Sequence, residues 1–288
     1  MASNAEFEVT PGATVAADQT AVLDSILVAV GAVPPALAGE AKIEFRNVAI
    51  SFNDRPVLHD VSFSVAQGQT LCILGRSGVG KSVALRILMG FLKPDAGAVF
   101  VDGEEITGLD EEGLRAIRQR VTMVFQNGAL FDSLSVRENV AFPLRERGNM
   151  GEEQIQQWVD RLIGLVGAED VAEVFPASLS TGRKRAVAIA RALACKPEVV
   201  LYDEPTTMVD PTIARRLGDL IQRLKRELGF TSIVVTHDMR FAERLADQVL
   251  FLHQGQALFF GPLQDFLAAR DEPIHQFLKL DAYRLPAS

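Results

Sequence analysis

The chain has 288 residues, of which 48% are hydrophobic and 23% are charged, and its formal net charge is −8. That apolar content is enough for a full core and excludes global disorder. The negative net charge argues against a general nucleic-acid-binding protein, because such proteins are usually basic.

Residues 1–40 are predicted to form an acidic, flexible N-terminal extension. They contain five acidic residues and no Lys or Arg, and they are rich in Ala, Pro and small polar residues. A short helix is expected near Ala21–Val30, but an aspartate and a Pro-Pro pair make this apolar stretch a poor membrane span. The acidic start also lacks the positive charge of a signal peptide. We therefore expect a cytoplasmic protein.

Two amphipathic strand patterns follow the extension. Segments 42–52 and 56–65 alternate apolar and polar residues, and the turn-forming sequence NDRP lies between them. They predict a small antiparallel layer. The run TLCIL at 70–74 is instead continuously apolar, which is typical of a strand that is buried on both faces. Helical periodicity begins just after Lys81.

Three more buried strands are predicted at 121–125, 199–203 and 231–237, with helical patterns between them. Strands that alternate with helices indicate a mostly parallel α/β core. Between Asn127 and Pro176 the pattern is mainly helical. The sequence therefore predicts an α/β fold of the phosphate-loop (RecA-like) type, in which a mostly parallel sheet carries an antiparallel β subdomain and an inserted helical subdomain at about 127–190.

The sequence GRSGVGKS at 75–82 fits the phosphate-loop pattern G-x-x-x-x-G-K-[ST]. It follows a predicted buried strand and opens a helix, which is the context that the motif requires. Backbone N–H groups of such a loop can surround a phosphate chain. Lys81 is expected to reach the β- and γ-phosphates, and the Ser82 hydroxyl is expected to bind Mg²⁺. The predicted nucleotide-binding residues are Gly75, Arg76, Ser77, Gly78, Val79, Gly80, Lys81 and Ser82.

Acidic and polar residues follow the other buried strands. In VVLYDEP, Asp203 ends a strand where it can reach the Mg²⁺ shell, and Glu204 is placed to orient or deprotonate the attacking water. His237 and Gln126 end two further strands, at the sheet edge where α/β proteins bind ligands. His237 is expected to contact the γ-phosphate, and Gln126 to bind water or Mg²⁺. A structural role for either residue alone is the alternative.

The sequence LSTGRKRAVAIARAL at 179–193 predicts a helix with a basic first turn. Ser180 and Thr181 can accept hydrogen bonds from free backbone N–H groups, and Gly182 lets a ligand come close to the backbone. Three basic residues, 183–185, then lie at the positive end of the helix dipole, which is unfavourable unless an anion lies opposite. The segment therefore predicts a second anion contact, separate from the phosphate loop.

Together these motifs resemble an ABC ATPase nucleotide-binding domain. The resemblance rests on the order of the phosphate loop, Gln126, LSTGRKR, LYDEP, Asp210 and His237. It covers residues 41–262, and residues 263–288 are expected to form a C-terminal helical tail. It implies ATP and Mg²⁺ as cofactors and a head-to-tail dimer of two copies with two ATP molecules between them. The anion opposite the basic first turn is then the partner's ATP.

The resemblance also implies roles for residues outside the phosphate loop. Ser180, Thr181 and Gly182 are implied to contact the γ-phosphate of the partner's ATP. Phe52 falls where an aromatic ring stacks on adenine, with packing in an edge strand as the alternative. Asp210 matches a loop that crosses the dimer interface. The usual signature is Leu-Ser-Gly-Gly-Gln, so the Cβ of Thr181 is expected to hinder approach of the phosphate unless its hydroxyl donates to it.

Three uses of ATP are compatible with the motifs: a membrane transporter subunit, a soluble ABC ATPase of the translation or DNA-repair kind, and a degenerate ATP-binding regulator. A single cassette without heptads argues against the soluble ATPases. The degenerate regulator is disfavoured because Lys81, Asp203, Glu204 and His237 are all present. We therefore expect a peripheral subunit on the cytoplasmic face of the inner membrane, bound to permease subunits and not to nucleic acid.

The segment FQNGALFDSLSVRENVAFPLRE at 125–146 resembles the Mla/Mce branch, whose ATPases drive lipid movement across the envelope of diderm bacteria. ARDEPIHQFL at 269–278 resembles the same branch. This implies phospholipid as the transported substrate, with an Mce-domain lipid-binding protein and a small cytoplasmic accessory subunit as further partners. An importer of small solutes is the alternative, and simple packing of ALFDSL within the helical subdomain is the other explanation of that segment.

Overall fold

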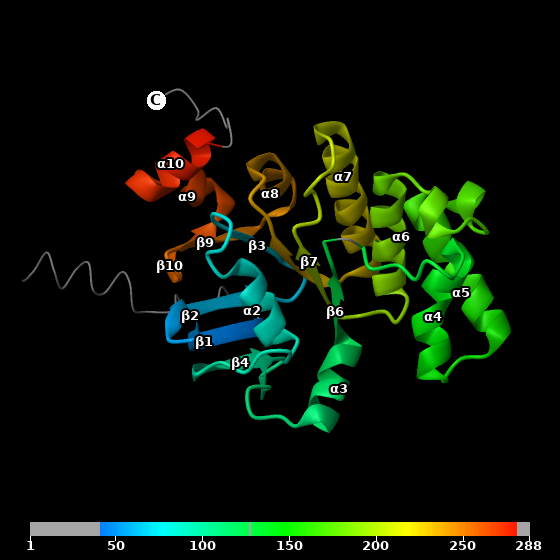
Figure 1. The fold of residues 1–288 in the computed structure, drawn as a ribbon, viewed down its shortest axis with the longest axis horizontal. Helices are drawn as coiled ribbons and strands as arrows, with labels where there is room; N and C mark the ends of the chain where they lie inside the picture. The colour runs from blue at the N-terminus through cyan, green and yellow to red at the C-terminus, as the bar shows by residue number, and fades with distance from the viewer. Residues whose placement is uncertain (1–40, 127, 281–288) are drawn as a thin grey trace, which may run out of the picture. The chain divides into compact units, whose positions relative to one another are not determined.

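The computed structural model describes residues 41–126 and 128–280, so the predicted N-terminal extension and its short helix lie outside the described residues. Two β-sheets and the helices around them make up this part (Figure 1). The four-stranded sheet contains β1 (Ala41–Phe52), β2 (Arg55–Ala66), β4 (Ala96–Val101) and β5 (Glu104–Glu105), in the order β2-β1-β4-β5. All three of its strand pairings are antiparallel, which confirms the predicted antiparallel layer.

The six-stranded sheet is mostly parallel, as the alternation of strands and helices predicts. It contains β3 (Thr70–Leu74), β6 (Val121–Val124), β7 (Val199–Asp203), β8 (Thr231–Val235), β9 (Gln248–His253) and β10 (Gln256–Pro262). Its order is β10-β9-β3-β8-β7-β6, and only the pairing of β10 with β9 is antiparallel among the described strands. The strands β4, β5, β9 and β10 are not among those predicted from the sequence.

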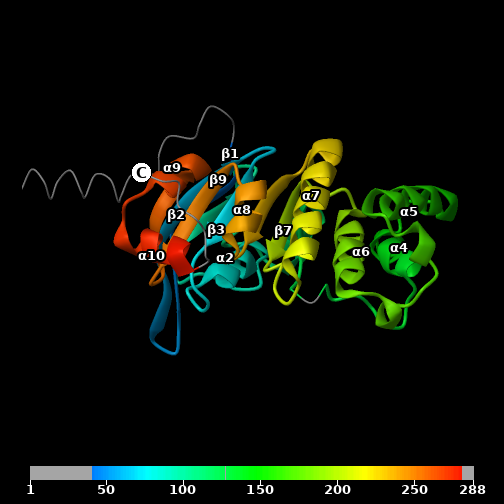
Figure 2. The ribbon, with the colours of Figure 1, turned by 90° about the horizontal axis from the view of Figure 1, so that it is seen from above.

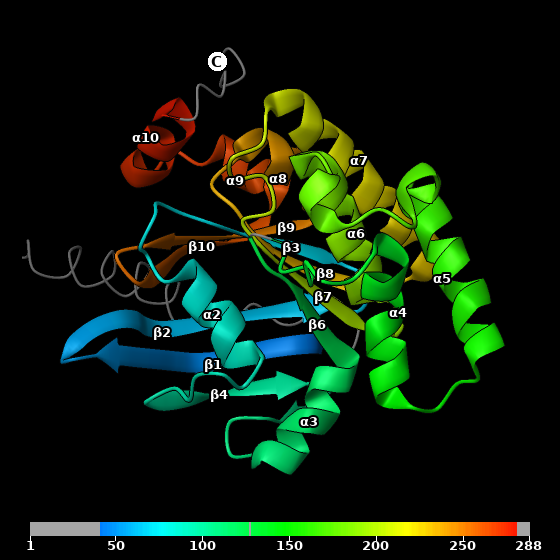
Figure 3. The same ribbon diagram turned by 45° about the vertical axis from the view of Figure 1, so that its right-hand side comes forward.

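Two apolar clusters lie on the two faces of the six-stranded sheet. In β3, Leu71 and Ile73 belong to the cluster shared with β1, β2 and α2 (Lys81–Leu88), whereas Cys72 and Leu74 belong to the other cluster. Every residue of β3 is buried, since both faces of the strand are covered. Figure 3 shows α2 alongside β1 and β2.

A helical subdomain lies beyond β6 and β7 (Figures 1 and 2). Its elements are α4 (Val136–Arg147), α5 (Glu152–Val166), the 3-10 turns η1 (Glu169–Val171) and η2 (Pro176–Ser178), and α6 (Thr181–Leu193). The predicted helical insertion is thereby confirmed. Its helices are amphipathic, and α5 buries the regularly spaced residues Ile155, Val159, Leu162, Ile163 and Val166.

The remaining helices are α3 (Glu111–Arg120), α7 (Pro211–Leu228), α8 (Met239–Leu245), α9 (Leu263–Ala268) and α10 (Glu272–Leu280). The last two fall in the segment expected as a helical tail, and they pack into the main core: Phe266, Ile274 and Leu278 are fully buried. Among the described residues, no helix is both long enough and apolar enough to cross a membrane.

Candidate nucleotide-binding site

The predicted phosphate loop connects the buried strand β3 to helix α2. Gly75 has a φ of +146° and Gly80 a φ of +107°, values that side chains with a Cβ rarely adopt. A Cβ on Gly75 would lie 2.5 Å from the carbonyl oxygen of Leu252, and one on Gly80 would lie 2.6 Å from Cδ2 of Leu58. Both glycines are therefore required by backbone angle and by space.

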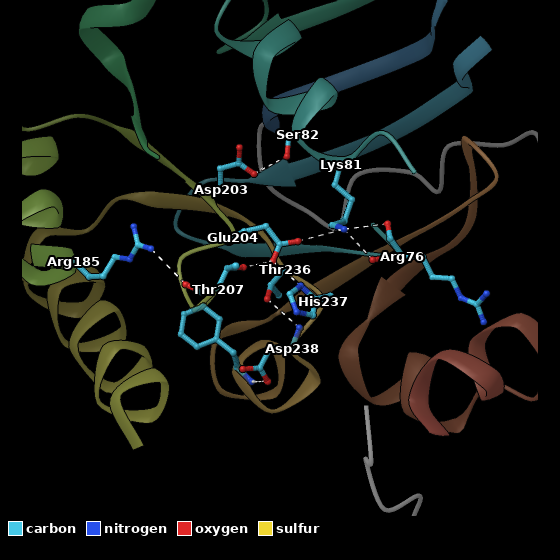
Figure 4. A network of polar contacts seen from close by, with 12 residues as sticks. Arg76, Lys81, Ser82, Arg185, Asp203, Glu204, Thr207, Thr236, His237 and Asp238 are labelled. Carbon is cyan, nitrogen blue, oxygen red and sulfur yellow. Dashed lines mark hydrogen bonds and ion pairs between the residues drawn. The ribbon is translucent and has the colours of Figure 1, made fainter. Parts of the chain in front are cut away.

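Lys81 is the first residue of α2, and its side chain is folded back over the loop. Only 6% of Lys81 is exposed. Its Nζ donates to the carbonyl oxygens of Gly75 at 2.9 Å and Arg76 at 3.2 Å. The same Nζ lies 3.3 Å from Oε1 of Glu204. The ammonium group is thus held at the loop by groups of its own chain (Figure 4).

The strand β7 brings Asp203 to Ser82, the second residue of α2. The Ser82 hydroxyl donates to Oδ1 of Asp203 at 2.7 Å. Gln126 follows β6, the neighbour of β7, and lines the same cavity as Ser82. Hydroxyl, carboxylate and amide oxygens suit Mg²⁺, which is commonly held by one or two carboxylates together with substrate phosphates. Within the described ranges, no group of three or more His, Cys, Asp and Glu residues could hold a metal ion.

Glu204 lies at the centre of the site. Its Oε2 is 2.8 Å from Nδ1 of His237 and accepts a hydrogen bond of 3.3 Å from the hydroxyl of Thr207. Its backbone has a φ of +47°, the left-handed region that is costly for a residue with a side chain. Such strain is found where the position of a side chain matters. In Figure 4 the side chains of Lys81 and His237 point toward Glu204.

These residues surround a cavity of about 620 Å³. The predicted residues that line it are Arg76, Ser77, Gly78, Gly80, Lys81, Ser82, Gln126, Glu204 and His237. Val57, Val83, Thr207, Phe277 and Leu280 also line it and were missed from the sequence. Thr207 is only three residues after Glu204, so its closeness in sequence to a predicted site residue was a signal for it. Phe277 and Leu280 carry no local signal, because they are remote from every motif.

The other predicted site residues lie outside this lining. Gly75 and Val79 are residues of the loop itself, and Asp203 accepts the hydrogen bond from the Ser82 hydroxyl. Phe52 ends β1 and is 41% exposed, away from the cavity walls. Asp210 is the N-cap of α7, where its Oδ1 accepts from the backbone N–H groups of Thr212 at 2.8 Å and Ile213 at 3.1 Å.

Ser180, Thr181 and Gly182 begin α6, and none of them lines the cavity that contains Lys81. Ser180 is the N-cap, as predicted, and its Oγ accepts from the backbone N–H of Arg183 at 3.4 Å. Ser180 and Gly182 instead line a different cavity, together with residues of α7. The start of α6 is therefore separate from the nucleotide cavity of the same chain.

The basic first turn of α6 has a carboxylate of its own chain beside it. The guanidinium group of Arg183 pairs with Asp170 of η1, with N–O distances of 2.8 and 3.0 Å. Asp170 of the same chain thus lies opposite Arg183 without a second copy. Contact of the basic first turn with the partner's ATP stays a prediction. Arg185 is buried, and burial lowers the pKa of its guanidinium. Its Nη2 donates to the carbonyl of Thr207 at 3.5 Å.

A glycine loop between a buried strand and a helix, with a buried lysine and an acidic strand end beside it, defines a phosphate-loop domain for nucleoside triphosphates. The ABC transporter family model matches residues 58–207. The methionine import ATP-binding protein MetN of Brucella abortus is 39% identical, over 88% of this chain and 69% of that protein. The chain therefore belongs to the ABC transporter family, as an ATP-hydrolysing subunit.

Solved structures support the same assignment. The ATP-binding cassette MJ0796, in a dimeric post-hydrolysis state bound to ADP and Pi, has a TM-score of 0.69 and 31% identity, over 77% of this chain and 98% of that one. The protein cbiO1 of Clostridium perfringens, part of the ABC transporter complex cbiONQ, has a TM-score of 0.75 and 27% identity, over 84% and 95% of the two chains. The α/β fold with its antiparallel layer and helical subdomain is the fold of these cassettes.

Proposed function

We propose that ATP is hydrolysed in the cavity between the phosphate loop and Glu204, with Glu204 as the general base. The observation that carries this proposal is the position of the Glu204 carboxylate, which is within 3.3 Å of Lys81 Nζ and 2.8 Å of His237 Nδ1. A carboxylate held in a cavity beside a phosphate loop can accept a proton from an attacking water. Glu204→Gln, with ATP binding and hydrolysis measured separately, tests this role.

The other residues of the cavity bind and orient the nucleotide. Lys81 exchanges its contact with Glu204 for the phosphates, which frees the carboxylate for water. Ser82, Asp203 and Gln126 would hold Mg²⁺, which supplies neutralisation of phosphate charge when bound. His237 holds Glu204 in place and is close enough to the cavity to contact the γ-phosphate. Phe52 is proposed to stack on adenine.

We infer that two copies close head to tail on two ATP molecules. The start of α6 lies outside the cavity of its own chain, which supports contact of Ser180, Thr181 and Gly182 with nucleotide held by a second copy. Asp210, at the start of α7, is proposed to lie at the same interface. The similar cassette MJ0796 was solved as a dimer, which supports this arrangement.

For the transported substrate, we propose a small solute that is imported through a permease at the inner membrane. This proposal is supported by the MetN relative, whose name describes methionine import. It replaces phospholipid as the first candidate, because the relatives reported above include no lipid-transport ATPase. Residues 41–262 are proposed to form the nucleotide-binding domain on the cytoplasmic face, with permease subunits as partners.

Phospholipid transport in an Mla/Mce-type system stays a second candidate, because segments 125–146 and 269–278 resemble that branch. Phe131 and Phe142 lie in the segment 125–146, and their ring centroids are 4.7 Å apart. Phe131 is 43% exposed and Phe142 36%. Exposed apolar side chains that cluster in this way mark interaction sites. We propose that this aromatic pair contacts the permease, with an Mce-domain protein and a small accessory subunit as further partners in the lipid system.

Co-purification of the full chain with its membrane partners separates the two candidates. A periplasmic solute-binding protein in the complex, together with ATPase stimulation by that protein loaded with methionine, supports the importer. An Mce-domain protein, together with phospholipid transfer between donor and acceptor vesicles, supports the lipid system. ATPase activity that does not rise when permease subunits are added would contradict both.

A further inference from the structure

Helix α10 contributes to the nucleotide cavity although it lies outside the residues that the family model matches. Phe277 and Leu280 of this helix line the cavity together with Arg76 and Lys81. Figure 4 shows the Arg76 side chain pointing away from Lys81, toward the red helices of the C-terminal region. The phosphate loop and α10, which are remote in sequence, thus both contribute to the cavity wall.

Sheet register explains why α10 lies at the phosphate loop. Leu74, the last residue before the loop, pairs with Phe251 of the neighbouring strand β9. The ring centroid of Phe251 is 5.1 Å from that of Phe277 and 5.6 Å from that of Phe266 in α9. Phe277 is 6% exposed and Leu278 is fully buried, so α10 is anchored by its own apolar face. The helix is a fixed part of the wall.

The side chains that line the cavity are of two chemical kinds. Lys81, Ser82 and Gln126 can bind phosphate or metal, whereas Val57, Val83, Phe277 and Leu280 offer only apolar surface. A nucleoside triphosphate is charged along its phosphates, and only its base and ribose present apolar faces. Leu280 is 72% exposed, so its apolar side chain is accessible from the cavity that it lines. Phe52, the aromatic residue expected at adenine, does not line the cavity.

We propose that the end of α10 forms an apolar wall for the adenosine part of the nucleotide, with Leu280 and Phe277 as the contacting side chains. The inference rests on the proposed function, because it assigns further residues to the same ATP site. Nucleotide affinity then depends on a helix from the C-terminal segment of the chain as well as on the phosphate loop.

The test compares ATP with inorganic tripolyphosphate, which has the phosphates but no adenosine. Both affinities are measured by calorimetry on the full chain. Leu280→Ala is expected to weaken ATP binding about fivefold, since it removes apolar contact to the base or ribose. Tripolyphosphate affinity is expected to change less than twofold. Leu280 is largely exposed, so the substitution leaves the core intact, which Phe277→Ala would not.

Leu258→Ala is the matched control, because Leu258 is also an exposed leucine, at 42%, but does not line the cavity. It should leave both affinities unchanged. The proposal is overturned if Leu280→Ala keeps ATP affinity within twofold of the wild type, or if tripolyphosphate loses as much affinity as ATP. Lys81→Ala tests the proposed function itself. If this variant binds ATP as tightly as the wild type, ATP does not bind in this cavity.

Discussion

The first turns of α2 and α6 both carry a cation, but the surroundings of the two cations differ. Lys81 of α2 is enclosed in the cavity, with a side-chain exposure of 6%, and faces Glu204. Arg183 of α6 has a side-chain exposure of 41% and pairs with Asp170, which is 65% exposed. In each case the cation pairs with a carboxylate of the same chain. The enclosed contact is expected to matter far more, because exposed ion pairs contribute little.

Backbone geometry separates the same two regions. Gly75 and Gly80 have positive φ angles and no room for a Cβ. Thr181 is exposed at the first helical position of α6, where ordinary helical angles suit any residue. The phosphate loop therefore demands its glycines for the fold of the chain itself. At position 181 the backbone angles do not require the family's usual glycine, so a threonine fits there without strain. A glycine would matter at this position only for the approach of the ligand.

The largest effect is expected from Glu204→Gln. The amide keeps the shape of the side chain but cannot act as a base, so hydrolysis should fall by about 10²–10⁴-fold while ATP still binds. Phosphate release and calorimetric ATP binding measure the two quantities. A variant that hydrolyses ATP at nearly the wild-type rate would show that the enclosed carboxylate is not the base.

Gly80→Ala sharpens the backbone comparison. The added Cβ meets Leu58 at 2.6 Å and the Val57 carbonyl oxygen at 3.1 Å, and the residue must keep a φ of +107°, so we expect a loss of about 2–3 kcal/mol in the free energy of unfolding. Urea denaturation measures it. Gly103→Ala is the control, since Gly103 has a φ of +75° but open space around it, and should cost about 1 kcal/mol. Equal losses in the two variants would rule out the steric argument.

Thr181→Gly tests the opposite case. Removing an exposed Cβ should let the partner's phosphate approach α6 more closely, so the ATPase rate should equal or exceed that of the wild type. The free energy of unfolding should fall by no more than about 1 kcal/mol, the usual cost of glycine in a helix. A drop in rate of about tenfold or more would instead assign an essential hydrogen bond to the Thr181 hydroxyl.

The smallest effect is expected from Arg183→Gln, which breaks the ion pair with Asp170. Both side chains are well exposed, so the free energy of unfolding should change by about 0.2–1 kcal/mol, and less at high salt. Asp170→Asn should produce a similar change. Thermal unfolding at low and high ionic strength provides the measurement. A loss above about 2 kcal/mol in either variant would show that this surface pair is as important as the enclosed one.

Strands could be predicted from the sequence where apolar residues form a local pattern. β3, β7 and β8 each contain a run of consecutive apolar residues, and β1 and β2 alternate around a turn. The strands β4, β5, β9 and β10 were not predicted. β9 contains the apolar run VLFL, but a short apolar run does not by itself distinguish a strand from a buried helix segment, and β5 has only two residues. Their pairing depends on neighbours that are distant in the chain. The positions of Phe277 and Leu280 in the cavity also depend on neighbours that are distant in the chain.

The phosphate loop, the acidic strand end and membership of the ABC family follow from the sequence alone, because glycine conformation and the spacing of ligating residues are local properties. Tertiary structure decided which side chains meet: Lys81 and His237 with Glu204, and Arg183 with Asp170. It also decided that α10 lines the cavity. The physical reason is that these contacts join segments that sheet register and core packing bring together. Register and packing depend on the whole chain, so a single motif does not predict them.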